Sequence, residues 1–331
     1  MKTKILITGA DGFIGSHVVE LFVKKGYQVR AFILYNSFNS YGWFDDIDIN
    51  VKSKIDFYFG DIRNYDSVFA SMQGCSAVLH LAALIGIPYS YNTPSSYLET
   101  NVTGTLNILQ AAKNLKLKKI VLTSTSEVYG SAKYIPMDEK HPINPQSPYA
   151  ATKVAADALG MSFHKSFNLP ITILRPFNTF GPRQSSRAVI PTIINQFLGK
   201  NEHLHLGNIY PKRDFTYVED VASAFYLAFK SNKNIGRILN VGSGFEISIK
   251  QIVERVSLIT NYKIKIKLDS KRKRNKNSEV TRLCANYNLA KKYLDWKPQF
   301  SELNKFNIGL EKTINWFSEK NYLKNSKKYI L

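Results

Sequence analysis

Cysteine is scarce in this sequence of 331 residues, and long apolar runs are missing from it. Its two cysteines, Cys75 and Cys284, lie far apart with no CxxC or Cys/His spacing, so they support neither a disulfide framework nor a zinc site, and we expect no metal. No apolar stretch approaches the roughly 18 residues that a membrane span requires. The chain runs from Met1–Lys4 directly into a strand-like Ile5–Thr8, without a signal-peptide pattern. These absences predict a globular protein of the reducing cytoplasm with no membrane partner.

Acidic residues are few relative to basic ones, since 25 Asp and Glu stand against 45 Lys and Arg and give a formal net charge of +20. The run Lys271–Lys276 raises the question of nucleic acid. Most lysines are scattered, however, and the sequence has no recognition-helix or single-strand-binding pattern. The basic run is expected in a solvated loop. We therefore predict no nucleic-acid partner, and the positive field is compatible with a small anionic substrate.

The first half of the chain alternates apolar strand candidates with helical patterns, which is typical of a parallel sheet covered on both faces. The expected strands are 4–8, 28–34, 55–59, 76–81, 119–124 and 170–174, and the expected helices lie near 13–25, 64–72, 95–114 and 148–167. This predicts an α/β fold with a doubly wound parallel sheet of the Rossmann type. Residues 1–177 with 213–242 are expected to form a dinucleotide-binding domain, and 178–212 with 243–331 a smaller interleaved α/β substrate lobe.

A glycine-rich turn follows the first predicted strand and opens the first helix. Gly9, Gly12 and Gly15 have the spacing GxxGxxG, which differs from the GxGxxG of ordinary dinucleotide dehydrogenases. Glycine suits such a turn because the pyrophosphate approaches the backbone closely while the helix N-terminus offers its N–H groups. Its position at the first strand-to-helix junction favours a dinucleotide site over a plain turn.

The sequence gives only weak evidence on whether the cofactor is NAD or NADP. The second predicted strand ends without the acidic residue that binds NAD ribose or the arginine that favours NADP, so Asn36 and Ser37 are only weak candidates for the ribose. Asp61 follows the third strand and either lies beside the adenine or opens a turn and caps a helix. Both interpretations of Asp61 stay open. We expect a tightly bound, recycled NAD and leave NADP as the alternative.

Tyr149 and Lys153 are four residues apart in a predicted helix, so their side chains share one face. A tyrosine can act as a base near neutral pH only if nearby positive charge lowers the pKa of its phenol from about 10. The lysine supplies that charge. Although a YxxxK match is common by chance, the upstream glycine turn and the intervening Thr125–Glu127 favour a redox site.

Together these segments resemble the extended short-chain dehydrogenase/reductase family, the NAD(P)-dependent nucleotide-sugar epimerases and dehydratases. The resemblance covers nearly the whole chain. Its motifs are the glycine turn, His80–Ala83, Asn101–Thr105, Tyr149 with Lys153, Arg175–Asn178, Gly181–Arg183, Arg213–Val221, Asn240–Gly242 and Asp295–Pro298.

The resemblance implies a set of binding residues. For the cofactor these are Gly9, Gly12, Phe13, Ile14, Gly15, Asn36, Ser37, Asp61, Ile62, Leu81, Ala82, Ala83, Asn101, Tyr149 and Lys153. For a nucleotide-diphosphate sugar they are Ile85, Asn178, Arg183, Val189, Arg213 and Arg282. Arginine suits a pyrophosphate because its planar group donates two parallel hydrogen bonds, although each arginine could instead be a surface residue.

The residues after the fifth predicted strand separate the chemistries within the family. Related epimerases carry small residues before Val-Tyr-Gly, whereas 4,6-dehydratases carry a glutamate, as Glu127 does here. Oxidation at C4 of the sugar acidifies the C5 proton, and loss of water across C5 and C6 then needs a base and an acid. By resemblance, Thr125 would orient the C4 hydroxyl for Tyr149, and Glu127 would take the C5 proton. Ser126 stands where dehydratases of thymidine-diphosphate glucose have an aspartate, so one glutamate is expected to serve both steps.

Three alternatives stay open. UDP-glucuronate decarboxylases also carry Thr-Ser-Glu, but they usually have an arginine shortly before the catalytic tyrosine, and Asn144–Pro148 contains none. A nucleotide-sugar 4-epimerase is the second alternative. The third is a catalytically silent dinucleotide-sensing protein on the same fold.

The segment Tyr35–Asp45 and the uncharged loop Ile85–Tyr91 resemble most closely the 4,6-dehydratases of legionaminic acid biosynthesis and related bacterial surface-glycan pathways. This implies a GDP- or UDP-linked N-acetylglucosamine-type substrate and a 4-keto-6-deoxy product. The helices at 95–114 and 148–167 carry apolar residues on several faces. By resemblance they would form a homodimer interface, with burial inside the monomer as the alternative.

Overall fold

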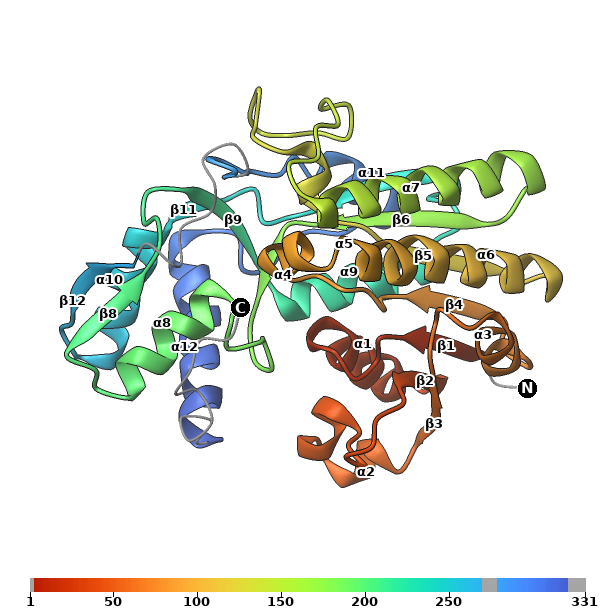
Figure 1. Ribbon diagram of the computed structural model, residues 1–331, viewed down its shortest axis with the longest axis horizontal. Helices are drawn as coiled ribbons and strands as arrows, with labels where there is room; N and C mark the ends of the chain where they lie inside the picture. Colours follow the sequence, from red (N-terminus) through yellow and green to blue (C-terminus); the bar gives the residue numbers. More distant parts are fainter. Residues whose placement is uncertain (1–2, 270–278, 321–331) are drawn as a thin grey trace.

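A seven-stranded parallel sheet forms the centre of the protein, whose computed structural model describes residues 3–269 and 279–320 (Figure 1). The strand order is β10-β6-β5-β4-β1-β2-β3. The bounds are β1 Lys4–Thr8, β2 Gln28–Leu34, β3 Ile55–Gly60, β4 Ala77–His80, β5 Lys119–Thr123, β6 Ile171–Pro176 and β10 Arg237–Val241. The central strands are almost continuously buried, as expected for a parallel sheet that is covered on both faces.

Helices cover the two faces of this sheet (Figure 1). One face packs against α1 Phe13–Lys24, α9 Val218–Lys230 and α11 Asn288–Leu294. The other packs against α3 Tyr65–Met72, α6 Gly104–Asn114 and α7 Pro148–Phe167. The short helices are η1 Gly42–Asp46, α2 Ile49–Lys52, α4 Ile87–Asn92, α5 Pro94–Tyr97, η2 Leu98–Thr103 and η3 Ser126–Tyr129. The predicted doubly wound fold is therefore confirmed.

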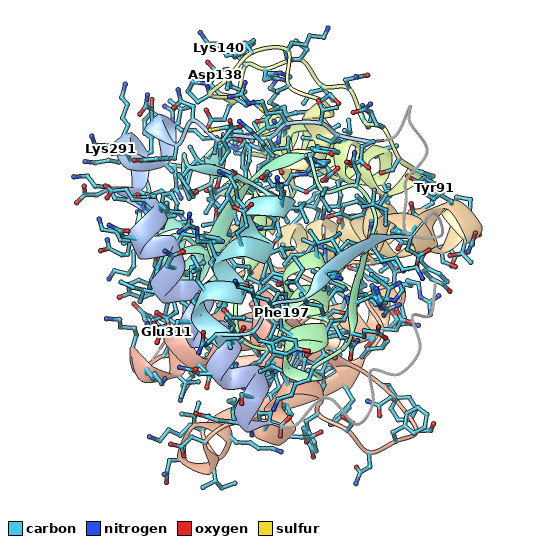
Figure 2. All side chains as sticks on the ribbon, turned by 90° about the vertical axis from the view of Figure 1, so that its left-hand side faces the viewer. Tyr91, Asp138, Lys140, Phe197, Lys291 and Glu311 are labelled. Carbon is cyan, nitrogen blue, oxygen red and sulfur yellow. The ribbon has the colours of Figure 1, made fainter. Side chains whose placement is uncertain are left out.

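A second group of elements has its own apolar core, centred on Phe180, Phe197 and Phe306. It contains a three-stranded sheet, β11-β9-β7, and a two-stranded sheet, β12-β8. The strands are β7 Asn178–Phe180, β8 His203–Leu206, β9 Lys212–Tyr217, β11 Glu246–Ser248 and β12 Lys265–Leu268, and the helices are α8 Val189–Leu198, α10 Ile249–Thr260 and α12 Leu303–Glu319. Figure 2 views the molecule from this side, with α12 and its Glu311 crossing the face.

The six strands predicted in the first half are present, but the predicted helix at 95–114 is three segments. It consists of α5, the π-helical turn η2 and α6. A π-turn inserts one extra residue per turn and is frequent at functional sites. Here it contains Asn101, whose side chain bonds Leu84 in the loop after β4.

Two absences can be stated for residues 3–269 and 279–320. None of their helices is long and apolar enough to cross a membrane. They also contain no cluster of side chains that could hold a metal ion, and Cys75 and Cys284 are both free thiols. The basic run Lys271–Lys276 lies outside the described residues.

Candidate active site

The glycine turn lies at the carboxyl end of β1. The next strand, β2, pairs with one edge of β1, and β4 pairs with its other edge, so the strand order reverses here. Such a switch point is where ligands bind in open parallel sheets. Gly9 has φ +63°, and a Cβ there would lie 2.6 Å from Ala82 N. A Cβ on Gly15 would lie 2.1 Å from the Gly9 carbonyl oxygen. The turn therefore accepts only glycine at both positions, and it leaves the first N–H groups of α1, including those of Phe13 and Ile14, without intrahelical partners.

The loop after β4 packs against this turn. Thr8 Oγ1 lies 2.7 Å from His80 Nδ1 and accepts a hydrogen bond from Ala82 N at 3.3 Å. Asn101 in η2 accepts from Leu84 N at 2.9 Å and donates to Thr152 Oγ1 at 3.0 Å, so it connects this loop to α7. Leu81, Ala82, Ala83 and Asn101 are thus brought to the cofactor end of the sheet, as the sequence suggested.

Asn36, Ser37, Asp61 and Ile62 lie at the carboxyl ends of the neighbouring strands β2 and β3. The Asn36 side chain shapes its own loop, because its Oδ1 accepts from Phe38 N and Ser40 N while its amide donates to Ser40 O. The Asp61 carboxylate accepts from Arg63 Nη2 at 2.6 Å and from Arg63 N at 2.9 Å, and these bonds lower its pKa. Both side chains have structural partners, and their contact with a cofactor stays a prediction.

The N-terminus of α7 brings Tyr149 and Lys153 to the carboxyl end of β5. Ser147 caps the helix, accepting from Ala150 N at 3.1 Å. Tyr149 is 8% exposed and Lys153 is 3% exposed. The Lys153 ammonium donates to the Thr123 carbonyl at 2.6 Å, and the Tyr149 phenol is hydrogen-bonded to Thr125. The helix therefore presents both side chains to one buried spot, as the YxxxK spacing predicts.

Burial dominates the ionisation of these two groups. It raises the pKa of Tyr149, and the negative charge of Glu127 adds to the rise while the hydrogen bond to Thr125 opposes it. Burial also lowers the pKa of Lys153 to about 8, opposed by the negative charge of Asp157. The sequence predicts a phenol whose pKa is lowered by the lysine. The structure differs, because loss of solvent around the phenol disfavours its anion.

Thr125 connects the tyrosine to the candidate acid and base. It caps η3, and its hydroxyl accepts from Glu127 N at 3.2 Å. Glu127 is half-buried in the first turn of η3, whereas the neighbouring Ser126 is 2% exposed. One hydroxyl at the carboxyl end of β5 thus bonds the phenol of Tyr149 and the backbone of Glu127, whose negative charge acts on the same phenol.

Two buried polar atoms near this centre have no hydrogen-bond partner within the described part of the chain. They are Thr123 Oγ1, at the end of β5, and Asn178 Oδ1, at the start of β7. Buried polar groups are nearly always paired in native proteins, so an orphan atom points to a ligand. Asn178 was predicted as a substrate residue. Thr123 was not, although a hydroxyl at the end of a predicted strand, two residues before Thr125, was an available signal.

The predicted substrate arginines divide into two places. Arg213 in β9 contacts Glu279 at 3.3 Å and donates to Val280 O, and Arg282 forms a two-point pair with Glu246 at 2.6 and 2.8 Å. A β-bridge between Lys212 and Arg282 brings these two arginines to one edge.

Arg183 is held elsewhere. Its guanidinium pairs with Glu20 of α1 at 2.6 Å, and its backbone has φ +68°. Of the remaining predicted substrate residues, Ile85 is 66% exposed in the loop before α4, and Val189 begins α8. These positions leave their substrate contacts as predictions.

Known proteins match this chain along nearly its whole length. A family model described as GDP-mannose 4,6 dehydratase matches residues 6–305. A UDP-glucuronate 4-epimerase from Thermodesulfobacterium geofontis is 33% identical over 329 residues, 95% of this chain and 96% of that protein. A dTDP-D-glucose 4,6-dehydratase from Dictyostelium discoideum is 32% identical over 268 residues, 76% of this chain and 61% of that protein.

A decarboxylase and a solved structure complete the comparison. The UDP-N-acetyl-alpha-D-glucosaminuronate decarboxylase of Bacillus cytotoxicus is 32% identical and aligns with 96% of this chain and 99% of that protein. The crystal structure of UDP-glucuronic acid 4-epimerase from Bacillus cereus, in complex with UDP-glucuronic acid and NAD, superposes with a TM-score of 0.86 at 30% identity, covering 97% of this chain and all of that one (100%). The relatives thus carry out epimerisation, dehydration and decarboxylation of nucleotide sugars.

Proposed function

The chain belongs to the extended short-chain dehydrogenase/reductase family of nucleotide-sugar epimerases, dehydratases and decarboxylases, and we propose that its own reaction is a 4,6-dehydration. The substrate would be a GDP- or UDP-linked N-acetylglucosamine-type sugar. The product would be its 4-keto-6-deoxy derivative, formed with loss of one water and no net redox change.

The cofactor is NAD, and the residues at the switch point fit it. The glycine turn leaves room for a pyrophosphate where a Cβ would clash with the backbone, and Thr123 Oγ1 and Asn178 Oδ1 are buried without a hydrogen-bond partner in the described part of the chain. When bound, NAD would supply reversible hydride transfer, from C4 of the sugar and later back to C6, and the proton that C5 gains in that last step would come from solvent. Because one turnover restores the cofactor, we expect it to copurify.

Tyr149 acts in the first step by taking the proton of the C4 hydroxyl. Thr125, already hydrogen-bonded to the phenol, would share its bond with that hydroxyl and orient it. Lys153 follows Tyr149 by one turn of α7, and its ammonium would stabilise the developing phenolate. The raised pKa of Tyr149 means that this help is needed near neutral pH.

Glu127 acts in the second step. The C4 ketone acidifies the C5 proton, which the carboxylate takes as a general base. The hydroxyl at C6 then leaves with a proton from the same carboxyl group, so that water is formed and the C5–C6 double bond remains. Ser126, at the position of the missing aspartate, has no acidic proton to give, which leaves both transfers to Glu127.

The observation that supports the proposal is that Glu127 lies beside the redox base. Thr125 bonds the phenol of Tyr149 and the backbone N–H of Glu127, and the negative charge of Glu127 raises the pKa of the phenol. Epimerisation needs the phenol alone, whereas elimination needs both groups. The uncharged loop from Ile85 to Tyr91 supports a neutral acetamido sugar over a uronate.

Decarboxylation of a uronate is the second candidate, and Arg187 favours it. Burial raises the pKa of the Tyr97 phenol, and the positive charge of Arg187 opposes that rise, so the guanidinium lies near Tyr97. The Tyr97 ring in turn lies 6.3 Å from the Tyr149 ring. An exposed arginine at this position could bind a carboxylate on C6 of the sugar.

Incubation in deuterated water without added cofactor tests the proposal. UDP- and GDP-N-acetylglucosamine are supplied separately, and product mass and C5 deuterium are followed by mass spectrometry and NMR. Dehydration predicts loss of one water with one deuterium at C5 from one of them. Loss of carbon dioxide from a UDP-linked uronate, while both N-acetylglucosamine substrates stay unchanged, would overturn it. A C4 epimer as the only product of any of these substrates would overturn it as well.

Matched variants separate the candidate reactions. Glu127→Gln keeps the size of the side chain, and we expect at least a roughly 100-fold slower loss of water while C4 is still oxidised. Tyr149→Phe should abolish oxidation as well, and unchanged biological activity in that variant would instead indicate a silent sensing protein. Arg187→Ala should leave dehydration of the acetamido sugar unchanged but remove turnover of a uronate.

The arrangement of domains and subunits is part of the same proposal. We propose that 1–177 with 213–242 bind the dinucleotide, that 178–212 with 243–331 bind the sugar nucleotide, and that two copies associate through α6 and α7. In the monomer α6 already buries Ile108, Leu109 and Ala112. Light scattering of the purified protein tests the dimer.

A further inference from the structure

A buried guanidinium lies between the two catalytic elements of the site. Arg175, at the end of β6, is 5% exposed. On one side its Nε and Nη2 donate to Asp157 Oδ2 at 3.0 and 2.9 Å. On the other its Nη1 donates to the Tyr129 hydroxyl at 2.9 Å, and the guanidinium lies 4.9 Å from the centre of the Tyr129 ring. The proposed chemistry uses none of these three groups directly.

The Asp157 side leads to the redox groups. Asp157 follows Lys153 by one turn and Tyr149 by two turns of α7, so the three side chains share a helix face. Asp157 also accepts from Ser124 Oγ at 2.8 Å. Ser124 lies between Thr123, which accepts from Lys153, and Thr125, which bonds Tyr149. The carboxylate thereby joins α7 to the strand end that holds both redox groups.

The Tyr129 side leads to the acid and base. Tyr129 belongs to η3, the same four-residue helix that carries Glu127. Its hydroxyl donates to Asn240 Oδ1 at 2.7 Å, and Asn240 donates to Met137 O at 3.0 Å. Met137 belongs to the long loop after η3, which projects at the top of Figure 1 and carries Asp138 and Lys140 in Figure 2. One end of η3 is therefore fixed through its tyrosine.

Such a buried ion pair is a weak source of stability. Removing two charges from water costs several kcal/mol each, roughly what their attraction returns, and apolar residues of the same volume often stabilise as well. Arginine does offer five donors in a rigid plane, so it can bind two partners at fixed angles at once. Arg175 uses that plane to bind α7 on one edge and η3 on the other.

We propose that Arg175 is a positioning residue that fixes the short helix of Glu127 relative to the helix of Tyr149, through Tyr129 on one side and Asp157 on the other. The inference rests on the proposed function, because it assigns Glu127 a step separate from that of Tyr149. Loosening the Tyr129 side should displace the acid and base while leaving the redox groups in place.

The test uses Tyr129→Phe, which keeps the ring and removes only the hydroxyl. We expect loss of water and C5 deuterium uptake to slow about tenfold or more, because small displacements of a catalytic group are costly. Oxidation at C4 should keep its rate, so reduced nicotinamide should accumulate after the enzyme is mixed with substrate and should be seen by its absorbance. Hydrogen exchange should rise in the amides of 126–130 but not in those of 148–158. Arg175→Lys alters the bonds to Asp157 as well, so it should also slow the loss of water but raise exchange in both segments.

Tyr217→Phe is the matched control, since it removes another buried phenol hydroxyl, in β9, and should change neither step. Equal slowing of both steps in Tyr129→Phe, with equal exchange in the two segments, would overturn the proposal. If the unaltered protein dehydrates no sugar, the proposed function is wrong, but the positioning role of Arg175 is still tested separately. Hydrogen exchange in the same variants still decides whether Arg175 positions η3.

Discussion

At the scale of single residues, Thr125 determines how the site can work. Its hydroxyl is shared between the backbone of Glu127 and the phenol of Tyr149, so these two groups cannot be placed independently. The sequence predicted all three residues from their order after a strand. It could not predict that burial would raise the pKa of Tyr149, because desolvation depends on how tightly Tyr97 and the loop before it pack around the ring.

The ionisation of Lys153 gives a pH prediction. Its ammonium is the form that stabilises the Tyr149 phenolate, and burial lowers its pKa to about 8, so this form is lost as the pH rises through about 8. Deprotonation of Tyr149, whose pKa is raised, increases steadily over the same range and favours oxidation. The rate of C4 oxidation should therefore rise from acid pH and level off above about pH 8, where the gain in phenolate offsets the loss of the Lys153 ammonium.

Stopped-flow absorbance of reduced nicotinamide measures this profile. Asp157→Asn removes the negative charge that opposes the lowering of the Lys153 pKa, so its rate should level off at a lower pH. Levelling off at the same pH in both proteins would show that another group controls the profile.

At the scale of elements, the sequence predicted the positions of the strands, but it did not predict several of the hydrogen bonds and ion pairs between side chains of different elements. Alternating apolar segments located β1 to β6, because a buried parallel strand has a strong local signature. The π-turn η2 and the pair between Arg282 and Glu246 were missed, because each depends on a contact with a segment distant in sequence. The pair between Arg183 and Glu20 of α1 was also not predicted, and the substrate contact of Arg183 stays a prediction.

The junction of β1 and α1 supports an element-scale prediction. In Gly15→Ala the added Cβ would lie 2.1 Å from the Gly9 carbonyl, so α1 must shift away from the turn that admits the pyrophosphate. We expect destabilisation by about 1–3 kcal/mol and loss of most of the copurifying NAD. Thermal unfolding and nucleotide released by heat measure the two effects. Gly199→Ala, at an exposed α8 terminus with φ −74°, is the control and should change neither.

At the scale of the whole molecule, the two cores are joined by a contact that sequence patterns do not indicate. The short helix η1 bonds the glycine turn, because Trp43 N donates to Asp11 O at 3.3 Å, and the Trp43 ring lies 5.6 Å from that of Trp316 in α12. Asp46 pairs with Lys320 at 3.4 Å next to it. This end of the sheet is thereby connected directly to the last described helix, about 270 residues later.

The net charge of +20 leads to a prediction about the molecule as a whole. A positive protein attracts a sugar diphosphate over a distance set by salt, about 30 Å at 0.01 M and about 8 Å at 0.15 M. The KM should therefore rise several-fold between these ionic strengths. The kcat should stay nearly constant, because Tyr149 and Lys153 act where solvent ions do not reach. Arg282→Gln, at the exposed edge, should raise KM at low salt and flatten its salt dependence. A flat KM in the unaltered protein would show that short-range contacts alone bind the substrate, whereas a parallel fall in kcat would place the salt effect in the chemical steps.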